Sequence, residues 1–175
     1  MFETLDIVRD GAISHLWLNR PDKLNPLSTQ VLDELACAAA QLNSERDVRV
    51  VIVGGRGRAF SAGADLSSFG GDGAMAREAA DAGRLMADAI EGLRAVSIAR
   101  LHGWCVGGAL VLAAACDLRV AASDARFSIP EVDLGIPLAW GGIPRLVREI
   151  GPCLLYTSPS PRDPRGDLVC RLLLE

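Results

Sequence analysis

The chain has 175 residues, 50% of them hydrophobic, and a formal net charge of −4 at pH 7. A chain of this length is the size of one domain, and it can bury about 70% of the surface that it exposes when unfolded. The small negative charge excludes the basic surface typical of proteins that bind nucleic acids or anionic membranes. We therefore expect a globular protein whose core forms without disulfides or a structural metal.

The cysteines and the apolar runs indicate where such a protein works. The five cysteines form no Cys-x-x-Cys pair, which favours free thiols in a reducing compartment. The opening segment MFETLDIVRD is charged and strand-like, and it does not have the character of a secretory signal. The longest apolar run, residues 109–115, is too short to span a bilayer. These features predict a cytoplasmic protein without membrane attachment.

The N-terminal part of the chain predicts a hairpin, a helix and a buried strand. Residues 4–8 and 12–18 flank Asp10-Gly11, a strong turn dipeptide. Ser28 suits the N-cap of a helix. The apolar residues that follow it recur with the helical period and are Val31, Leu32, Leu35, Ala38, Ala39 and Leu42. Residues 48–53 form a short apolar run, which is typical of a central strand covered on both faces.

Strands and helices alternate through the rest of the domain. Residues 54–73 are loop-rich, residues 74–96 predict an alanine-rich helix, and a second helix begins at Gly107-Gly108 and runs through Ala115. Further short strands are predicted at residues 97–101, 117–121 and 125–129. This alternation is typical of a layered α/β domain with crossover connections.

The composition changes abruptly after Gly151. Residues 152–167 hold four of the nine prolines and show neither a helical nor a strand period. We therefore expect residues 1–151 to form the core domain and residues 152–175 to form an irregular tail, which we interpret as sequence foreign to the domain.

Two loops have the features of a ligand-binding site. The segment AFSAGADL (residues 59–66) follows the buried strand, and its small residues allow a ligand to approach the backbone closely. In HGWCVGGAL (residues 102–110), paired glycines open a helix whose N-terminus offers unpaired N–H groups and the positive end of a dipole. Two such N–H groups directed at one carbonyl oxygen would form an oxyanion hole. The alternative is that each loop is only a tight turn.

Several segments together resemble the successive motifs of the crotonase (enoyl-CoA hydratase/isomerase) superfamily. The resemblance covers about residues 5–151, and the motifs occur in the order and spacing of that family. They are LNRPDKLNPLS, AFSAGADL, HGWCVGGAL, ACDLRVA and FSIPEVDLGIP, followed by GGIPRLVREIG.

The resemblance implies an α/β fold, a crotonase-like (ClpP/crotonase) spiral of ββα units that lacks the family's C-terminal helical region. In this family two backbone N–H groups hold the thioester oxygen of acyl-CoA, and by position they belong to Ala64 and Gly108. Ala62, Asp65 and Leu66 fall where the family loop lines the CoA pocket. Coenzyme A is then part of the substrate, without a metal, nicotinamide or flavin, and intact members form homotrimers or hexamers.

Glu131 falls where the family places its catalytic glutamate, which moves a proton next to the thioester. A carboxylate held in an apolar site has a raised pKa, which suits proton transfer near neutral pH. The alternative is a solvated surface glutamate at the end of a strand. Asp133 is close in sequence, but the resemblance gives it no role.

Val111 occupies the position at which hydratases of the family usually carry a second glutamate. Hydration of a 2-enoyl thioester needs a water held between two carboxylates, whereas isomerases of the family work with one. The valine therefore favours an enoyl-CoA isomerase over a hydratase. The alternatives are another crotonase reaction, such as acyl-CoA thioester hydrolysis, and a non-catalytic fragment that binds CoA or a partner protein.

The other candidate residues carry less specific signals. His15 and His102 do not have metal-ligand spacing, so a structural or solvent-facing role is expected. The segment GGRGR (residues 54–58) lacks the Gly-Lys-Ser/Thr ending of a P-loop. Arg56 and Arg58 either attract the CoA phosphates or are exposed arginines without a role.

Overall fold

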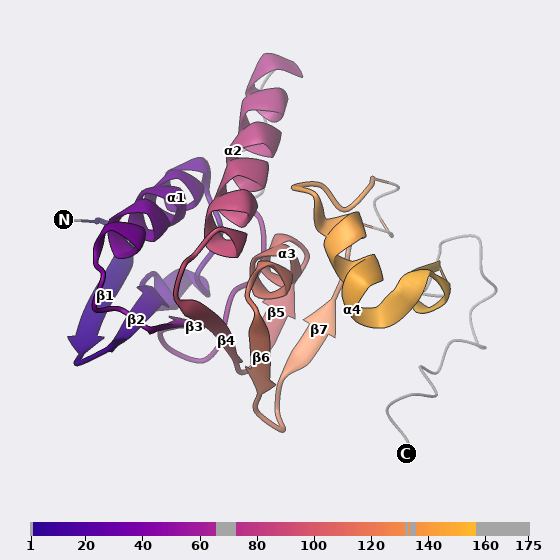
Figure 1. Ribbon diagram of the computed structural model, residues 1–175. Helices are drawn as coiled ribbons and strands as arrows, with labels where there is room; N and C mark the ends of the chain where they lie inside the picture. The colour runs from indigo at the N-terminus through magenta and orange to yellow at the C-terminus, as the bar shows by residue number, and fades with distance from the viewer. Residues whose placement is uncertain (1, 66–72, 132, 134–135, 157–175) are drawn as a thin grey trace.

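The computed structural model describes residues 2–65, 73–131, 133 and 136–156, whose strands form two sheets (Figure 1). In the larger sheet β1 (Leu5–Asp10) pairs antiparallel with β2 (Ile13–Leu18), which confirms the predicted hairpin. The strands that continue this sheet in parallel, in that order, are β3 (Val50–Gly55), β4 (Val96–Leu101) and β6 (Leu118–Ala121). Helices lie on the crossovers between the parallel strands, so the layered α/β class is confirmed.

Two helices cover the same face of the larger sheet (Figure 1). The first, α1 (Thr29–Ser44), begins after Ser28, whose Oγ accepts a hydrogen bond from the Val31 N–H at 3.4 Å. This bond confirms the predicted N-cap. The second, α2 (Gly73–Glu91), packs beside α1. The buried residues of α1 are those predicted from the helical period: Val31, Leu32, Leu35, Ala38, Ala39 and Leu42.

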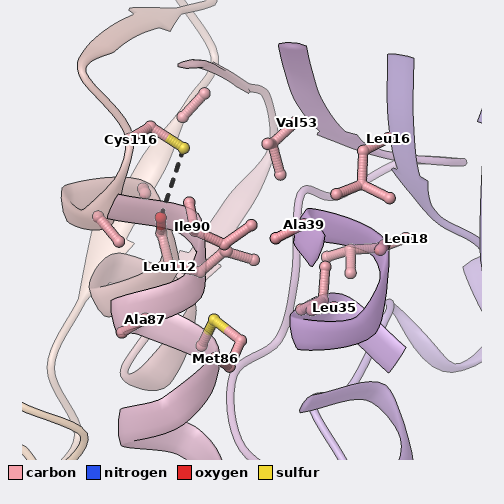
Figure 2. Packing of buried hydrophobic residues seen from close by; sticks show 14 of the residues in the cluster. Leu16, Leu18, Leu35, Ala39, Val53, Met86, Ala87, Ile90, Leu112 and Cys116 are labelled. Carbon is pink, nitrogen blue, oxygen red and sulfur yellow. Dashed lines mark hydrogen bonds between the residues drawn. The ribbon is translucent and has the colours of Figure 1, made fainter. Parts of the chain in front are cut away.

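The core lies between this helix layer and the sheet. Both the strands and the helices contribute completely buried side chains to it, among them Leu16, Leu35, Val53, Met86 and Ile90 (Figure 2). A third helix, α3 (Gly108–Ala115), packs against α2, and all of its residues except Leu110 are buried. A helix that is apolar all round is typical of an element enclosed by its neighbours. The start of α3 therefore has a fixed position in the fold.

The opposite face of the sheet is less covered by the described residues. Val51 and Val53 of β3 are completely buried, whereas Val50 and Ile52 are only half-buried. Leu118 of β6 is exposed as well. In the described part of the chain β3 is therefore covered fully on the face of α1 and α2 and only partly on the other face.

Two elements differ from what the sequence predicts. The strand β5 (Trp104–Val106) pairs in parallel with β7 (Arg126–Ser128) to form the smaller sheet, and its three residues are too few to show a period. The helix α4 (Gly142–Tyr156) has a kink at Gly151, where φ is +79°. The residue after the kink is Pro152. The helix thus continues beyond the expected end of the domain, and the rest of the expected tail, residues 157–175, lies outside the described residues.

A carboxylate joins the end of α3 to β4. Asp117 Oδ2 accepts hydrogen bonds from the backbone N–H and the hydroxyl of Ser97, both at 2.8 Å, and the Asp117 N–H donates to Ser97 Oγ at 2.9 Å. Ser97 itself is buried. Replacing Asp117 with alanine leaves these two buried donors unsatisfied, which typically costs about 1–3 kcal/mol.

We expect Asp117→Ala to lower the free energy of unfolding by about 2 kcal/mol, as measured by urea denaturation. The matched control is Asp124→Ala, because Asp124 is exposed in the turn between β6 and β7. That variant should stay within about 0.5 kcal/mol of the unchanged chain. Equal losses in the two variants would show that the Asp117 bonds do not stabilise the fold.

Candidate active site

The smaller sheet brings the two predicted loops side by side. An isolated parallel bridge joins Ser61 to Cys105 of β5, and a second bridge joins Ala64 to Leu27. Residues 61–64 therefore lie between the segment that precedes α1 and strand β5. Because α3 begins directly after β5, Ala64 and Gly108 sit on two adjacent backbone segments.

The side chain of Asn25 holds the first of these loops in place. Its Nδ2 donates to the carbonyl oxygens of Arg56, Ala59 and Phe60, at 2.9, 3.0 and 3.2 Å. Its Oδ1 accepts a hydrogen bond from the Arg20 N–H at 2.9 Å. Asn25 is buried, and its φ of +53° lies in the left-handed region that asparagine tolerates better than most residues. One amide thus fixes the path of the chain from β3 into the loop.

The backbone of the loop is also bonded to its neighbours, with Ala64 as an exception. Ser61 Oγ donates to the Asn25 carbonyl oxygen at 2.7 Å and accepts from the Gly63 N–H at 3.1 Å. The N–H groups of Ala62 and Asp65 donate to the carbonyl oxygens of the LNPL segment, residues 24–27. Among the described residues, the Ala64 N–H donates no backbone hydrogen bond. This group is therefore available to a ligand, as the prediction for Ala64 requires.

The second loop ends in a glycine pair at the start of α3. Gly107 is the N-cap residue, with φ at +51°, and its N–H donates to the Ser128 carbonyl oxygen at 2.8 Å. Gly108 is the first residue of α3, so its N–H has no intrahelical partner. The helix dipole adds positive potential at this end. The arrangement favours an oxygen with partial negative charge near the Gly108 N–H.

Glu131 lies directly against this helix start. A Cβ atom at Gly107 would lie 3.0 Å from Glu131 Cδ and would collide with Oε1, so the carboxylate occupies the space that the glycine leaves open. Its Oε2 is buried and has no hydrogen-bond partner among the described residues. Burial raises the pKa of the Glu131 carboxyl above its ordinary value. Oε2 of this carboxylate therefore accepts no hydrogen bond from the described part of the chain.

The two loops also touch each other close to Glu131. A Cβ atom at Gly63, whose φ is +89°, would lie 3.2 Å from the carbonyl carbon of Val106. The structure thus brings Ala64, Gly108 and Glu131 into one region, although their roles stay predictions. Of the residues expected at the CoA pocket, Ala62 is exposed and Asp65 is half-buried, while Leu66 lies outside the described residues.

The surroundings of Val111, three residues after Gly108 in α3, are apolar. Val111 is completely buried, and a Cβ atom at Gly142 would lie 2.7 Å from Val111 Cγ2 and 2.9 Å from Leu138 Cδ2. Trp140 is not among the residues predicted for the site, and its indole packs against Gly108. Gly108, together with Gly83 in an alanine-rich helix, is the sequence feature that could have indicated this contact. A glycine inside a helix often marks a place where another group packs closely against the backbone.

The other sequence candidates have structural partners. His15 stacks on Trp17 with the ring centroids 5.6 Å apart, and His102 Nε2 lies 2.9 Å from the Gly57 carbonyl oxygen. Arg56 pairs with Asp6 at 2.6 Å. The described residues contain no cluster of three or more His, Cys, Asp or Glu side chains that could hold a metal ion. Their helices include none that is long and apolar enough to cross a membrane.

The buried cysteines stay uncharged at physiological pH. Cys105 and Cys116 are free thiols in the core, and burial raises the pKa of each to about 12. Neither is therefore arranged as a nucleophile, since the reactive form of cysteine is the thiolate. Cys37 of α1 is free and exposed.

Comparisons with known proteins identify the fold and the family of the chain. The fold matches the solved structure of an enoyl-CoA hydratase/carnithine racemase from Magnetospirillum magneticum, with a TM-score of 0.82 and 32% identity over 87% of this chain and 59% of that one. The chain therefore has the layered fold of the crotonase class. The family model for enoyl-CoA hydratase/isomerase matches residues 9–155. The chain belongs to the enoyl-CoA hydratase/isomerase family.

Relatives in this family differ in their chemistry. The chain is 37% identical over 154 residues to a probable enoyl-CoA hydratase of Mycobacterium bovis, covering 86% of this chain and 58% of the relative. It is 37% identical over 166 residues to the peroxisomal Delta(3,5)-Delta(2,4)-dienoyl-CoA isomerase of Arabidopsis thaliana, covering 86% and 60%. The chain thus spans less than two thirds of the length of these relatives, and both a hydratase and an isomerase are similar to it.

The contact between Gly107 and Glu131 can be tested without an activity assay. We expect Gly107→Ala to push the carboxylate toward water, so the pKa of Glu131 falls toward its ordinary value, as measured by carbon NMR of labelled glutamate. The matched control is Gly11→Ala, because Gly11 has a φ of +56° and no atom lies within 4 Å of the added Cβ. Both variants should lose about 1–2 kcal/mol of stability from the positive φ. An unchanged Glu131 pKa in Gly107→Ala would contradict the contact.

Proposed function

We propose that this chain acts on acyl-CoA and transfers a proton next to the thioester, with Glu131 as the base. The observation that carries the proposal is the placement of the Glu131 carboxylate against Gly107, at the positive end of α3, with Oε2 buried and without a partner among the described residues. A carboxylate placed in this way is arranged to accept a proton from a ligand that binds at the helix start. Membership of the enoyl-CoA hydratase/isomerase family supports an acyl-CoA thioester as that ligand.

The proposed mechanism places the thioester oxygen between the N–H groups of Ala64 and Gly108. Glu131 removes a proton from C2 of a 3-enoyl-CoA, and the electron pair moves toward the thioester oxygen to give an enolate. The two N–H groups stabilise the charge that develops there, and each such donor typically lowers the barrier by roughly 3–4 kcal/mol. Glu131 then returns the proton to C4, which leaves a 2-enoyl-CoA and an ionised carboxylate. Coenzyme A enters as part of the substrate, and no step uses a separate cofactor.

Isomerisation is favoured over hydration by the surroundings of Val111. Hydration needs a water held by a second polar group, and this position of α3 carries a buried valine packed near Leu138 and Gly142. An apolar wall excludes water from this side of the site, so a proton held by Glu131 returns to the substrate carbon. A single carboxylate is sufficient for that transfer.

Hydration is the second candidate because relatives of similar identity carry that name. The probable enoyl-CoA hydratase of Mycobacterium bovis is as similar to this chain as the dienoyl-CoA isomerase of Arabidopsis thaliana. Incubating the purified chain with 3-hexenoyl-CoA and with 2-hexenoyl-CoA, and separating the products by chromatography, distinguishes the two reactions. Formation of 2-hexenoyl-CoA without 3-hydroxyhexanoyl-CoA supports isomerisation. Hydrated product alone would reverse the preference, and no product with bound CoA would indicate a binding protein.

Replacing Glu131 with glutamine should reduce turnover on the active substrate by about 10²–10⁴-fold, because the amide cannot accept the proton. Acyl-CoA binding, measured by calorimetry, should remain. The matched control is Asp133→Asn, two residues away and exposed, which should leave turnover within about twofold of the unchanged chain. Less than about tenfold loss in a folded Glu131→Gln variant would exclude Glu131 as the base.

The raised pKa of Glu131 predicts how activity depends on pH. The base acts in its ionised form, so kcat/KM should fall as pH drops through the Glu131 pKa, and the midpoint should lie above 4.5, the ordinary value for glutamate. Stability changes in the opposite direction. The folded state holds this proton more tightly than the unfolded state, so stability is lost as pH rises from 4.5 through the folded pKa. The free energy of unfolding of Glu131→Gln at pH 7, measured with urea, should therefore equal or exceed that of the unchanged chain. A lower value would contradict burial of the Glu131 carboxylate without a hydrogen-bond partner.

A further inference from the structure

Trp140 occupies an unusual position for a large aromatic residue. Its side chain is only 5% exposed and belongs to the main core cluster. Its φ of +59° lies in the left-handed region, which is rarely occupied by bulky residues and costs about 1–3 kcal/mol of backbone strain. Contacts of the indole therefore have to offset this strain.

The indole rests on glycines of two different helices. A Cβ atom at Gly83 of α2 would collide with Cγ, Cδ1 and Nε1 of Trp140 alike, so the face of the five-membered ring lies over that glycine. A Cβ atom at Gly108 of α3 would lie 2.6 Å from Cη2, 2.9 Å from Cε3 and closer still to Cζ3. The six-membered ring therefore covers the first residue of α3. The side chain fills the junction between α2 and α3 only because neither glycine has a Cβ.

A buried arginine fixes the backbone of Trp140 to α2. Arg145 Nη1 donates to the carbonyl oxygen of Trp140 at 3.3 Å and to that of Gly141 at 3.2 Å. Its Nη2 forms ion pairs with Asp88 and Glu91 of α2, both at 2.7 Å. Arg145 is itself buried, whereas Asp88 and Glu91 are partly exposed, and together these bonds tie the backbone at Trp140 to α2.

We propose that Trp140 limits the length of the acyl group that the site accepts. The inference rests on the proposed function, in which the Gly108 N–H holds the thioester oxygen. The Glu131 carboxylate lies against Gly107, and the indole lies against Gly108, so the two flank the helix start on which the substrate binds. The carbons that follow the thioester then lie beside the indole, which blocks their extension between α2 and α3.

A cavity made by a smaller side chain at position 140 would have an apolar lining. Ala82 and Met86 of α2 and Val111 of α3 are buried and belong to the same apolar cluster as Trp140. An enlarged cavity with such a lining is dry and binds apolar ligands. A smaller side chain at position 140 would therefore open a channel into which a longer acyl chain can extend, while short chains would gain nothing.

The test compares the affinities of butyryl-CoA and decanoyl-CoA, neither of which has a double bond to react, by calorimetry. The purified chain should bind decanoyl-CoA no more than a few times tighter than butyryl-CoA. In Trp140→Leu and Trp140→Ala the ratio of the two affinities should shift toward decanoyl-CoA by at least about tenfold, which corresponds to burying about two further methylene groups. Trp140→Phe, which keeps a ring, should shift it less.

The matched control is Leu35→Ala, a completely buried residue of α1 that does not border the helix start. It lowers stability by creating a cavity elsewhere in the core, and it should leave the affinity ratio unchanged. An unchanged ratio in every folded Trp140 variant would overturn the length limit while acyl-CoA binding stands. Absence of binding of either thioester by the unchanged chain and the variants would overturn the proposed function and this inference together.

Discussion

The buried amide of Asn25 is the interaction on which the arrangement of the candidate site depends. It lies between the end of β3 and the segment that enters α1. It bonds to the carbonyl oxygens of Arg56, Ala59 and Phe60 and to one N–H of its own segment. Without it, those carbonyl groups would be buried without donors, which is costly in a low-dielectric interior. The loop can therefore leave the Ala64 N–H without a backbone partner in the described part of the chain, because the other polar groups around it are satisfied. The hydrogen bonds of Asn25 thus allow the Ala64 N–H to remain without a backbone partner in the described part of the chain.

A second constraint is close packing at the glycine pair before α3. Because Gly107 has no side chain, the Glu131 carboxylate packs against it, and the Trp140 indole packs against Gly108 in the same way. One short stretch of backbone thus contacts a carboxylate and an aromatic ring. Burial disfavours the charge on Glu131, and the dipole of α3 acts in the other direction at the same point. Burial is the cause of the raised pKa of the Glu131 carboxyl. The positive potential at the start of α3 would stabilise partial negative charge on a bound thioester oxygen.

Much of the fold can be predicted from local pattern. The hairpin around Asp10-Gly11, the N-cap at Ser28 and the buried face of α1 all follow from turn chemistry and the helical period, and the structure confirms them. The strand β5 is different, because three residues are too few for a period and its pairing partners lie far away in sequence. The incomplete cover on one face of β3 could not be predicted either, since an apolar run does not reveal which neighbours cover it.

The site was predictable only in part. The motifs indicated which residues belong together, and the structure places the Ala64 loop, Gly108 and Glu131 in one region. The packing of Trp140 could not be predicted from the sequence, because it depends on Gly83 and Gly108 approaching one indole from two helices. Leu66 lies outside the described residues, so its predicted contact with CoA stays a prediction.

The enclosure of α3 has a consequence for how proteins built on this fold can change their chemistry. A helix that is surrounded by core on nearly every side cannot tilt or slide without disturbing the layers around it. The amide at its start therefore keeps its position, and exchanges of side chains around it can alter the reaction without moving it. Positions 111, 131 and 140 are where such exchanges meet the substrate in the proposed geometry. One immobile helix can thus serve many reactions without a change of fold.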